Sequence, residues 1–484
     1  MTMLNHHSNK LLLLISAFLL FSCNKLVEIP DPKNSLTTDR VFNNDTQAIG
    51  AMAGILTQMI NADASSSFAS GLTSQAARAS ADEINLAFNS NGNIGDLARN
   101  SLTAESGDAN GIWSSAYQAI YGANGVLEGI EASKSALLHA QTRTELTAEA
   151  KFLRAFSYFY LVNCFGDVPL LLSTNLAENS NKPRTAVAIV YQQIINDLID
   201  AANALPADYS VSGGERIRAN KWAAKALLAR VYLYTGDNSK AIQEATDVIG
   251  QTGLYQLETA DLNKVFLKNS SETIWQLQQN VNKIYIGNAV PEAVGMLPSP
   301  LHTGYSGDLS PNLLKTFEPG DLRKAAWIDS TNFSQGGVDY NARFIYKYKT
   351  GRHNLVIGGA ATEYYMVLRF AEMYLIRGEA FALSGQLSAG IEDLNILRRR
   401  AGIVPLPTTL TRDQTLAAIA KERQTELFGE WGHRWFDLKR TGKAEQVLSA
   451  IPAKQPWRGS YQLLYPIPKT ELQRDHFLTQ NPNY

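Results

Sequence analysis

The side chains that could carry out a reaction are scattered along the chain and show no spacing typical of an active site. The sequence contains no H-E-x-x-H zinc motif, no G-x-x-x-x-G-K-S/T phosphate-binding loop and no G-x-S-x-G nucleophile motif. Asp82 and Glu83 could serve glycoside hydrolysis only if two carboxyl groups faced one sugar, and a solvated or capping role is commoner. We therefore expect no catalytic residue, no metal site and no cofactor.

Aromatic rings and amide groups in irregular segments are better suited to binding a sugar. A ring can stack on the apolar face of a sugar, and an amide can both donate and accept hydrogen bonds with its hydroxyl groups. Residues 85–93 and 285–340 combine such side chains with turn-forming residues. Ordinary loop packing is the alternative for each candidate. The predicted ligand contacts are Asn85, Phe88, Asn91, Tyr285, Tyr305 and Trp327.

The two cysteines, Cys23 and Cys164, are too few for a disulfide framework or a cysteine-rich zinc site. Cys23 follows an apolar run, residues 11–21, which is too short to cross a bilayer and is typical of a signal peptide. The sequence Leu-Phe-Ser-Cys that ends at Cys23 resembles the lipobox of bacterial lipoproteins. We expect residues 1–22 to be removed, Cys23 to carry a lipid and residues 23–36 to form an extended tether. An ordinary cleaved signal peptide is the alternative.

The composition is that of a foldable globular protein without a charge surplus. The chain has 484 residues, and 44 Lys plus Arg nearly balance 45 Asp plus Glu, which gives a net charge of -1. Nucleic-acid binding needs concentrated Lys and Arg, so nucleic acid is not an expected partner. After the signal peptide, no apolar window is long enough to cross a membrane, so attachment is expected through the lipid anchor only.

Helical periodicity dominates the chain and predicts the elements that position these side chains. Between about residues 252 and 358 no helical period persists, and the run at 272–278 indicates a strand. The predicted fold is mostly α-helical, with an irregular loop-rich insert at 252–358 that contains a few short strands. Helices are predicted over residues 145–165, 186–204, 219–234, 239–249, 361–383, 388–400 and 412–429.

Two predicted helix pairs share a spacing of small residues. Ala229 is followed after twelve positions by Ala241, and Gly378 is followed after twelve positions by Gly390. The spacing partly matches the tetratricopeptide repeat, in which small residues let two antiparallel helices approach closely, although no strict repeat period is visible. Stacked helical pairs are therefore the expected scaffold.

Three motifs occur in order in the last third of the chain: LRFAEMYLIRGEA at 368–380, IAKERQTELFGEWGHRWFDLKR at 419–440 and LYPIPKTEL at 464–472. Together with the lipobox, they resemble the SusD/RagB family of outer-membrane nutrient-binding lipoproteins. The segments AKFLRAFSY at 150–158 and FGDVPL at 165–170 resemble the same family. The similarity therefore covers nearly the whole chain.

Two short departures from the family pattern lie close to the C-terminus. Asn483 stands where the family usually has glycine, and Asp475-His476 stands where an Asn-Pro pair is usual. These departures affect the expected local turn and leave the resemblance intact.

The resemblance implies a helical scaffold with tetratricopeptide-like pairs, forming a single body over residues 37–484, anchored by lipid at the cell surface of the outer membrane. It also implies that the protein captures oligosaccharides or peptides and passes them to a SusC-like TonB-dependent transporter, without being an enzyme. Two other functions stay open: a glycan-degrading helical enzyme and a purely structural lid of the transporter. The sequence does not choose among starch, fructan, host glycan and peptide ligands.

The polar residues of the 419–440 motif are predicted to be structural. They alternate with apolar residues on one helix and its extension, where carboxylates and guanidinium groups can pair across turns and fix helix packing. Trp222 and Trp275 lie in apolar patterns and are expected in the core. The motif residues in the predicted network are Glu422, Arg423, Glu426, Glu430, Arg434, Trp435 and Asp437.

Overall fold

The computed structural model describes residues 41–61, 66–85, 92–298, 308–335 and 337–484, and within them helices dominate, as the sequence predicts. The α-helices are α3 (Asp45–Ile60), α4 (Thr73–Ser80), α5 (Gly92–Ala98), α6 (Gly107–Ala132), α7 (Ala140–Phe165), α8 (Leu176–Asn179), α9 (Val187–Ala204), α10 (Lys221–Thr235), α11 (Asn238–Ile249), α12 (Pro291–Met296), α13 (Pro311–Thr316), α14 (Leu322–Trp327), α15 (Phe370–Leu383), α16 (Leu387–Arg400), α17 (Arg412–Leu427), α18 (His433–Arg440), α19 (Ala444–Leu448) and α20 (Lys469–Arg474). The strands are β1 (Thr273–Leu277), β2 (Ile328–Gln335), β3 (Val338–Ile345) and β4 (Tyr365–Arg369).

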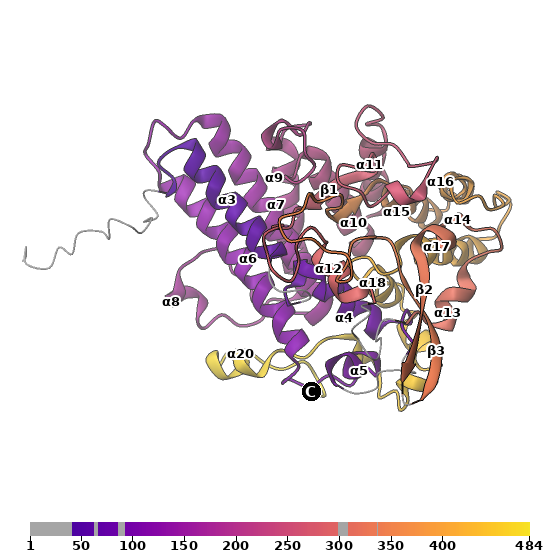
Figure 1. Cartoon of the computed structure of the whole chain (residues 1–484). Helices are drawn as coiled ribbons and strands as arrows, with labels where there is room; N and C mark the ends of the chain where they lie inside the picture. Colours follow the sequence, from indigo (N-terminus) through magenta and orange to yellow (C-terminus); the bar gives the residue numbers. More distant parts are fainter. Residues whose placement is uncertain (1–40, 62–65, 86–91, 299–307, 336) are drawn as a thin grey trace, which may run out of the picture.

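Long helices pack side by side in the first half of the chain. α7 lies against α6 and α9, and α3 lies against α6 and α7 (Figure 1). The apolar stripe predicted on α7 is buried, including Phe152, Phe156 and Phe159. The helix ends at the predicted Gly166, which has a φ of 76° that suits glycine and whose N–H donates to the Val162 carbonyl.

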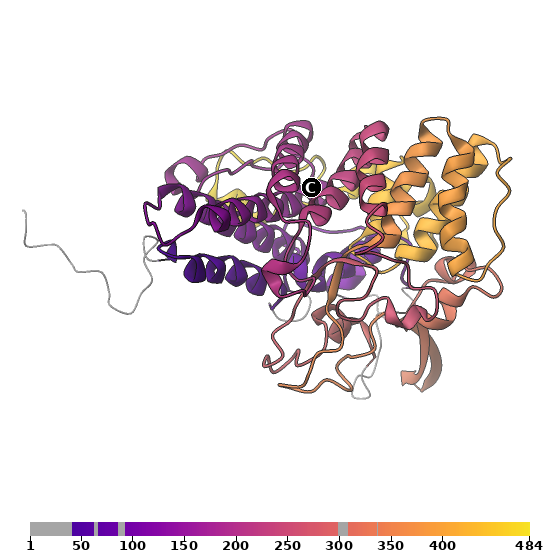
Figure 2. The same cartoon turned by 90° about the horizontal axis from the view of Figure 1, so that it is seen from above.

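Two helical pairs continue this row of helices. α10 packs on α11, α15 packs on α16, and α11 lies against α15, so that the pairs stack (Figure 2). A Cβ on Gly390 would lie only 2.6 Å from the carbonyl oxygen of Gly378, and a Cβ on Gly378 would lie 3.0 Å from the carbonyl oxygen of Gly390. The predicted close approach of α15 and α16 at these glycines is therefore confirmed.

The predicted helix over residues 361–383 is wrong in its first part. Tyr365–Arg369 is the strand β4, and α15 begins at Phe370. β4 pairs antiparallel with β1, with Met366 opposite Gln276, which confirms the strand predicted at 272–278. Both strands are buried along their whole length, and a short buried apolar run has the same pattern in a strand and in a helix.

The loop-rich insert lies on one side of the helical row (Figure 2). It contains the short helices α12, α13 and α14 and the antiparallel hairpin of β2 and β3, which is paired from Ile328–Ile345 to Gln335–Val338. Irregular backbone joins these elements, as the sequence predicts. The long helices therefore form the scaffold, and the insert contributes most of the loops on one side of it.

The C-terminal segment returns to the first half of the chain. The Tyr465 N–H donates to the Cys164 carbonyl at 2.8 Å, and the Asn481 side-chain amide donates to the Phe165 carbonyl at 2.9 Å. Asn483 has a φ of 68°. Asn tolerates this left-handed region better than most residues with a side chain, which explains how it replaces the glycine usual in the family.

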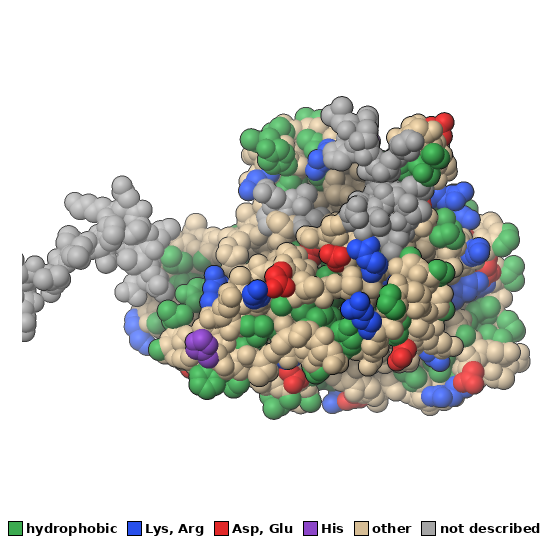
Figure 3. Space-filling view, turned by 90° about the horizontal axis from the view of Figure 1, so that it is seen from below, with side chains coloured by type: hydrophobic (Ala, Val, Ile, Leu, Met, Phe, Trp, Pro, Cys, Tyr) green, Lys and Arg blue, Asp and Glu red, His purple; other side chains and the backbone are tan. Residues whose placement is uncertain are grey.

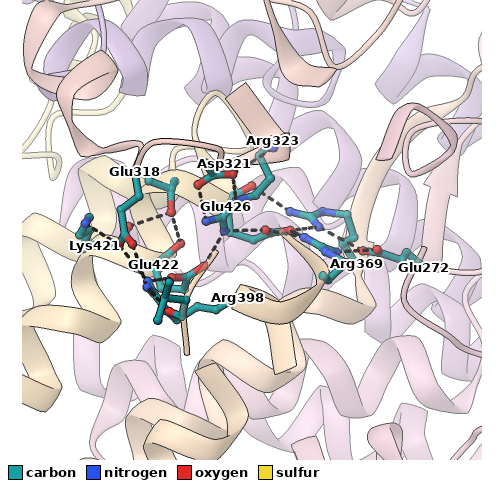
Figure 4. A network of polar contacts seen from close by, with 12 residues as sticks. Glu272, Glu318, Asp321, Arg323, Arg369, Arg398, Lys421, Glu422 and Glu426 are labelled. Atoms are coloured by element: carbon teal, nitrogen blue, oxygen red, sulfur yellow. Dashed lines mark hydrogen bonds and ion pairs between the residues drawn. The ribbon is translucent and has the colours of Figure 1, made fainter. Parts of the chain in front are cut away.

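A buried ion-pair network joins the insert to the C-terminal helices (Figure 4). Its centre is the fully buried Glu426 carboxylate on α17, which accepts hydrogen bonds from Arg323 on α14, Arg369 on β4 and Arg400 on α16. Burial alone would raise the pKa of Glu426, but the three guanidinium groups hold this pKa well below its ordinary value. The carboxylate is therefore charged and shared among four elements.

The predicted structural network is confirmed, with one difference in its geometry. Its pairs mostly run between elements, whereas the sequence suggested pairing across the turns of one helix. Arg423 on α17 pairs with Asp437 on α18 at 2.7 Å, and Glu430 accepts from Arg369 at 3.0 Å. Trp435 and Trp275 are fully buried, as expected for core residues, whereas Trp222 is half-buried.

Candidate ligand-binding site

The six predicted ligand contacts fall into two groups. Phe88, Asn91 and Tyr305 lie outside the described residues, as does the predicted lipidation site Cys23. Asn85, Tyr285 and Trp327 are described and have different surroundings.

The structure contradicts the prediction that Trp327 contacts a ligand. Its side chain is fully buried at the end of α14, and its indole N–H donates to the Leu262 carbonyl at 3.0 Å. The ring also lies beneath Lys347, whose ammonium is 4.9 Å from the ring centroid. A ring enclosed in this way has no free face for a sugar, so Trp327 is a core residue.

Tyr285 is the described aromatic candidate that solvent reaches. Its side chain is 70% exposed, and the neighbouring Ile284 is 67% exposed. The turn that carries both is closed by the Lys283 carbonyl, which accepts from the N–H groups of Ile286 and Gly287 at 3.2 and 2.8 Å. The backbone therefore fixes the position of a ring that is free to contact a ligand.

A second loop holds the Tyr285 turn in place. Asn288 donates its N–H to the Val356 carbonyl at 3.0 Å and accepts from the Val356 N–H through its side chain at 2.7 Å. Val356 and Ile357 are both more than half exposed. The two loops together present four exposed apolar side chains, and such exposure commonly marks an interaction surface.

A polar groove lies beside the Tyr285 turn. It has a volume of about 540 Å³ and lies between the end of α3 and the first half of α6, with Lys283 on its wall. The Asn61 side chain at the end of α3 accepts from the Asn280 N–H at 2.6 Å, which ties the turn to the groove. Exposed hydroxyl and amide groups of Thr57, Gln58, Ser114 and Gln118 line it.

The groove and the four exposed apolar side chains of the neighbouring loops together suit an amphipathic ligand. Hydroxyl and amide groups can donate and accept hydrogen bonds, whereas an exposed tyrosine ring offers an apolar face with a polar tip. A sugar has the same two kinds of surface. The sequence pointed to the Tyr285 ring as a candidate but gave no sign of the groove, because the polar residues of the groove lie on two regular helices that come together only in the fold.

Asn85 lies at a separate, smaller cavity of about 260 Å³. Its N–H donates to the Asp308 carbonyl at 2.7 Å, and its side-chain amide donates to the Asp308 carboxylate at 2.9 Å. Lys454 lines the same cavity, and its buried ammonium donates to three backbone carbonyls and to Asn100 Oδ1. The polar groups of Asn85 and Lys454 therefore mainly hold chain segments together.

The carboxyl pair Asp82 and Glu83 does not face one open site. Asp82 accepts two hydrogen bonds from Arg434, and Glu83 is buried, with the Gly429 N–H 3.3 Å from its carboxyl oxygen. Burial and the neighbouring Asp82 raise the pKa of Glu83 to about 7. In the described part of the chain, no cluster of three His, Cys, Asp or Glu side chains could hold a metal ion.

Neither the surface charge in Figure 3 nor the helices show a feature typical of a nucleic-acid-binding or membrane-spanning protein in the described residues. On the face in Figure 3, basic and acidic side chains are scattered among neutral ones and form no extended field of one sign. Across the described residues, the helices are all too short or too polar to cross a bilayer.

The stacked helical pairs with a loop-rich insert on one side define the class of protein by its fold. The chain belongs to the SusD/RagB family. Residues 35–233 match a family described as "Starch-binding associating with outer membrane", and residues 327–484 match the SusD family.

Individual relatives agree with this assignment. SusD-like protein P2 of Formosa agariphila is 29% identical over 425 residues, which are 78% of this chain and 82% of the relative. A solved structure titled "Laminarin binding SusD-like protein" is 26% identical with a TM-score of 0.75, and the match covers 92% of this chain and 100% of that one. A SusD superfamily protein of Bacteroides vulgatus shares the fold with a TM-score of 0.76 at 20% identity, over 92% of this chain and 100% of that one.

Proposed function

We propose that the protein is a cell-surface nutrient-binding lipoprotein that captures oligosaccharides and passes them to a TonB-dependent outer-membrane transporter. The observation that carries the proposal is the polar groove between α3 and α6 with the exposed Tyr285 turn fixed at its edge. The laminarin-binding relative supports a carbohydrate ligand. A peptide ligand is the alternative within the same role.

The groove would bind a sugar through two kinds of contact. The Tyr285 ring would stack on one face of a pyranose, while Gln58, Ser114 and Gln118 would exchange hydrogen bonds with its hydroxyl groups. Lys283, an exposed ammonium on the same wall, would donate to a ring or hydroxyl oxygen. None of these contacts changes a covalent bond, so the proposed role is binding and release.

The transporter and the lipid anchor are the remaining parts of the proposal. Membership of the family supports a SusC-like transporter as the partner, and the sequence around Cys23 supports lipid attachment at the outer-membrane surface. Two competing roles are a glycan-degrading enzyme and a purely structural lid of the transporter. Asp82 is ion-paired with Arg434, which disfavours Asp82 and Glu83 as the catalytic carboxyl pair of a glycan-degrading enzyme.

Affinity electrophoresis of the full chain in gels that contain laminarin, starch or another soluble glycan tests the proposal. Binding retards the protein in at least one gel, and an assay of reducing ends in the same mixtures stays at background. New reducing ends would favour the enzyme. Absence of retardation in every glycan and peptide tested, with a transporter that still requires the protein, would favour the lid.

A further inference from the structure

A second, larger groove lies away from the candidate ligand site. It has a volume of about 1100 Å³ and is lined mainly by α17 and by α18 and α19, together with the ends of α10 and α15. None of its lining residues belongs to the polar groove between α3 and α6. It is also about twice as large as that groove, and no part of the proposed sugar-binding role uses it.

The floor of the groove is a rigid frame of ion pairs. Asp437 accepts from Arg423 at 2.7 Å and from Arg440 at 2.8 Å, and Arg440 also pairs with Glu379 at 2.6 Å. These side chains lie on α15, α17 and α18, so three helices hold them in place. Charged groups shared in this way are preorganised and do not need to be ordered again when a ligand arrives.

Two hydrogen-bond donors of the lining residues have no acceptor among the residues that the structure describes. The Arg423 side chain is 2% exposed, and its Nη1 has no hydrogen-bond partner. The Tyr234 hydroxyl, which belongs to the same lining, is also buried without a partner. Buried donors are nearly always paired in folded proteins. Both atoms are enclosed, so an oxygen acceptor from outside would reach them only if the side chains that cover them moved aside.

The walls and the rim define the rest of the ligand. The walls are apolar and partly open to solvent, with Leu383, Leu416, Ala417, Ala420 and Val447 among their residues. Five basic side chains and three acidic ones line the groove, and four of the basic ones, all except Lys443, are ion-paired with carboxylates of this chain. Lys443 on the rim is exposed, and no acidic group among the described residues pairs with its ammonium. An apolar chain that carries negative charge complements this lining, whereas an uncharged glycan would leave the apolar walls unmatched.

We propose that this groove binds an acidic, apolar peptide segment of a partner protein. The apolar side chains of the segment pack on the wall formed by α17, and a carboxylate of the segment pairs with the exposed ammonium of Lys443 on the rim. The small side chains of Ala417 and Ala420 leave room for the backbone of the segment. This site is separate from the sugar groove, so the protein would hold its nutrient and its partner at the same time.

Fluorescence anisotropy with a labelled peptide tests the proposal on the full chain. The probe is a short peptide of Leu, Ala and Glu, and its matched control replaces every Glu with Gln. The acidic peptide binds, and the Gln peptide binds at least about tenfold more weakly because it lacks the carboxylate. Binding also weakens as salt is added, since the rim charges are exposed. Equal binding of the two peptides, or binding of neither, would overturn the proposal.

Substitutions on one helix then locate the site without touching the ion-pair frame. Ala417→Trp and Ala420→Trp fill the groove from exposed positions on α17 and abolish binding of the acidic peptide, whereas Arg412→Trp on the same helix lies outside the lining and has no effect. Lys443→Glu weakens binding and leaves the fold unchanged. Melting curves and glycan retardation equal to those of the parent show that each variant is folded. Unchanged peptide binding by the two filled variants would place the peptide elsewhere and contradict the assignment.

Discussion

The Arg434 guanidinium lies against the Asp82 carboxylate, and its Nε and Nη2 each donate a hydrogen bond of 2.7 Å. The two residues are 352 positions apart in the sequence. Their side chains are only 13% and 5% exposed. The pair therefore fixes α18, in the most distinctive motif of the chain, to the end of α4 near the N-terminus.

Arg434→Ala should lower stability more than it changes ligand binding. The substitution leaves the Asp82 carboxylate buried without its partner, which costs about 3 to 5 kcal/mol when a buried pair is broken. Urea unfolding measures the change. Arg474→Ala is the control, because the Arg474 side chain is 76% exposed and its pair with Glu471 lies at the surface, where such pairs contribute about 1 kcal/mol at most. Equal stability of the two variants would contradict the structural role of Arg434.

Gly390→Ala should destabilise the pair formed by α15 and α16. The new Cβ would lie 2.6 Å from the Gly378 carbonyl oxygen, so the helices must move apart, at a cost of about 1 to 3 kcal/mol. Gly50→Ala on α3 is the matched control, because its Cβ would meet nothing within 4 Å. That substitution should stabilise the helix by about 0.5 to 1 kcal/mol. Thermal melts that move in the same direction for both variants would refute the close approach.

The stability of the Glu292→Gln variant relative to the parent should increase as pH rises. Burial raises the pKa of Glu292 from 4.5 to about 8, so the folded protein holds a proton that the unfolded chain releases. The stability this provides is complete below about pH 4.5 and is lost as pH rises toward 8, by at most about 1.4 kcal/mol per pH unit. Gln cannot ionise and escapes this loss. The melting temperatures of parent and variant, compared at pH 5 and pH 8, should therefore diverge, and a constant difference would disprove the burial of an un-ionised carboxyl group.

Cys23→Ala should release the protein from membranes. The prediction rests on the lipobox, and several acyl chains hold a protein firmly whereas one chain gives only marginal attachment. Fractionation of cells that express the parent or the variant measures the effect. Cys164→Ala is the control, since Cys164 is buried in α7 and its thiol faces no membrane. Firm membrane attachment of the Cys23 variant would sink the lipoprotein assignment.

Much of the helical scaffold could be predicted because its signals are local. The stripe of phenylalanines on α7, the glycine that ends it and the small residues of the α15–α16 pair each act within one or two helices. β4 was harder to predict, since its residues 365–368 are apolar and buried like much of the helix that follows them. The partners in the ion-pair network were equally hidden, because the guanidinium groups that Glu426 meets come from three other elements.

The candidate site was predicted less well than the scaffold. Exposure cannot be read from composition, so Trp327 and Tyr285 looked alike as aromatics of one loop-rich insert, although one is buried and the other is open to solvent. The polar residues of the groove gave no signal either, since Gln58 and Gln118 are ordinary on the surface of a helix. Only the fold brings them beside the Tyr285 turn.

Titration calorimetry with the glycan that retards the parent protein is the most direct test of the proposed sugar site. We expect the parent to bind this glycan without releasing reducing ends and Tyr285→Ala to bind it about fivefold or more weakly, because a stacking ring contributes about 1 kcal/mol or more. Tyr121→Ala, which removes an exposed ring on α6 outside the groove, should bind like the parent. Equal affinities for the parent and both variants would contradict the site, and failure of the parent to bind any glycan would contradict the carbohydrate-binding function itself.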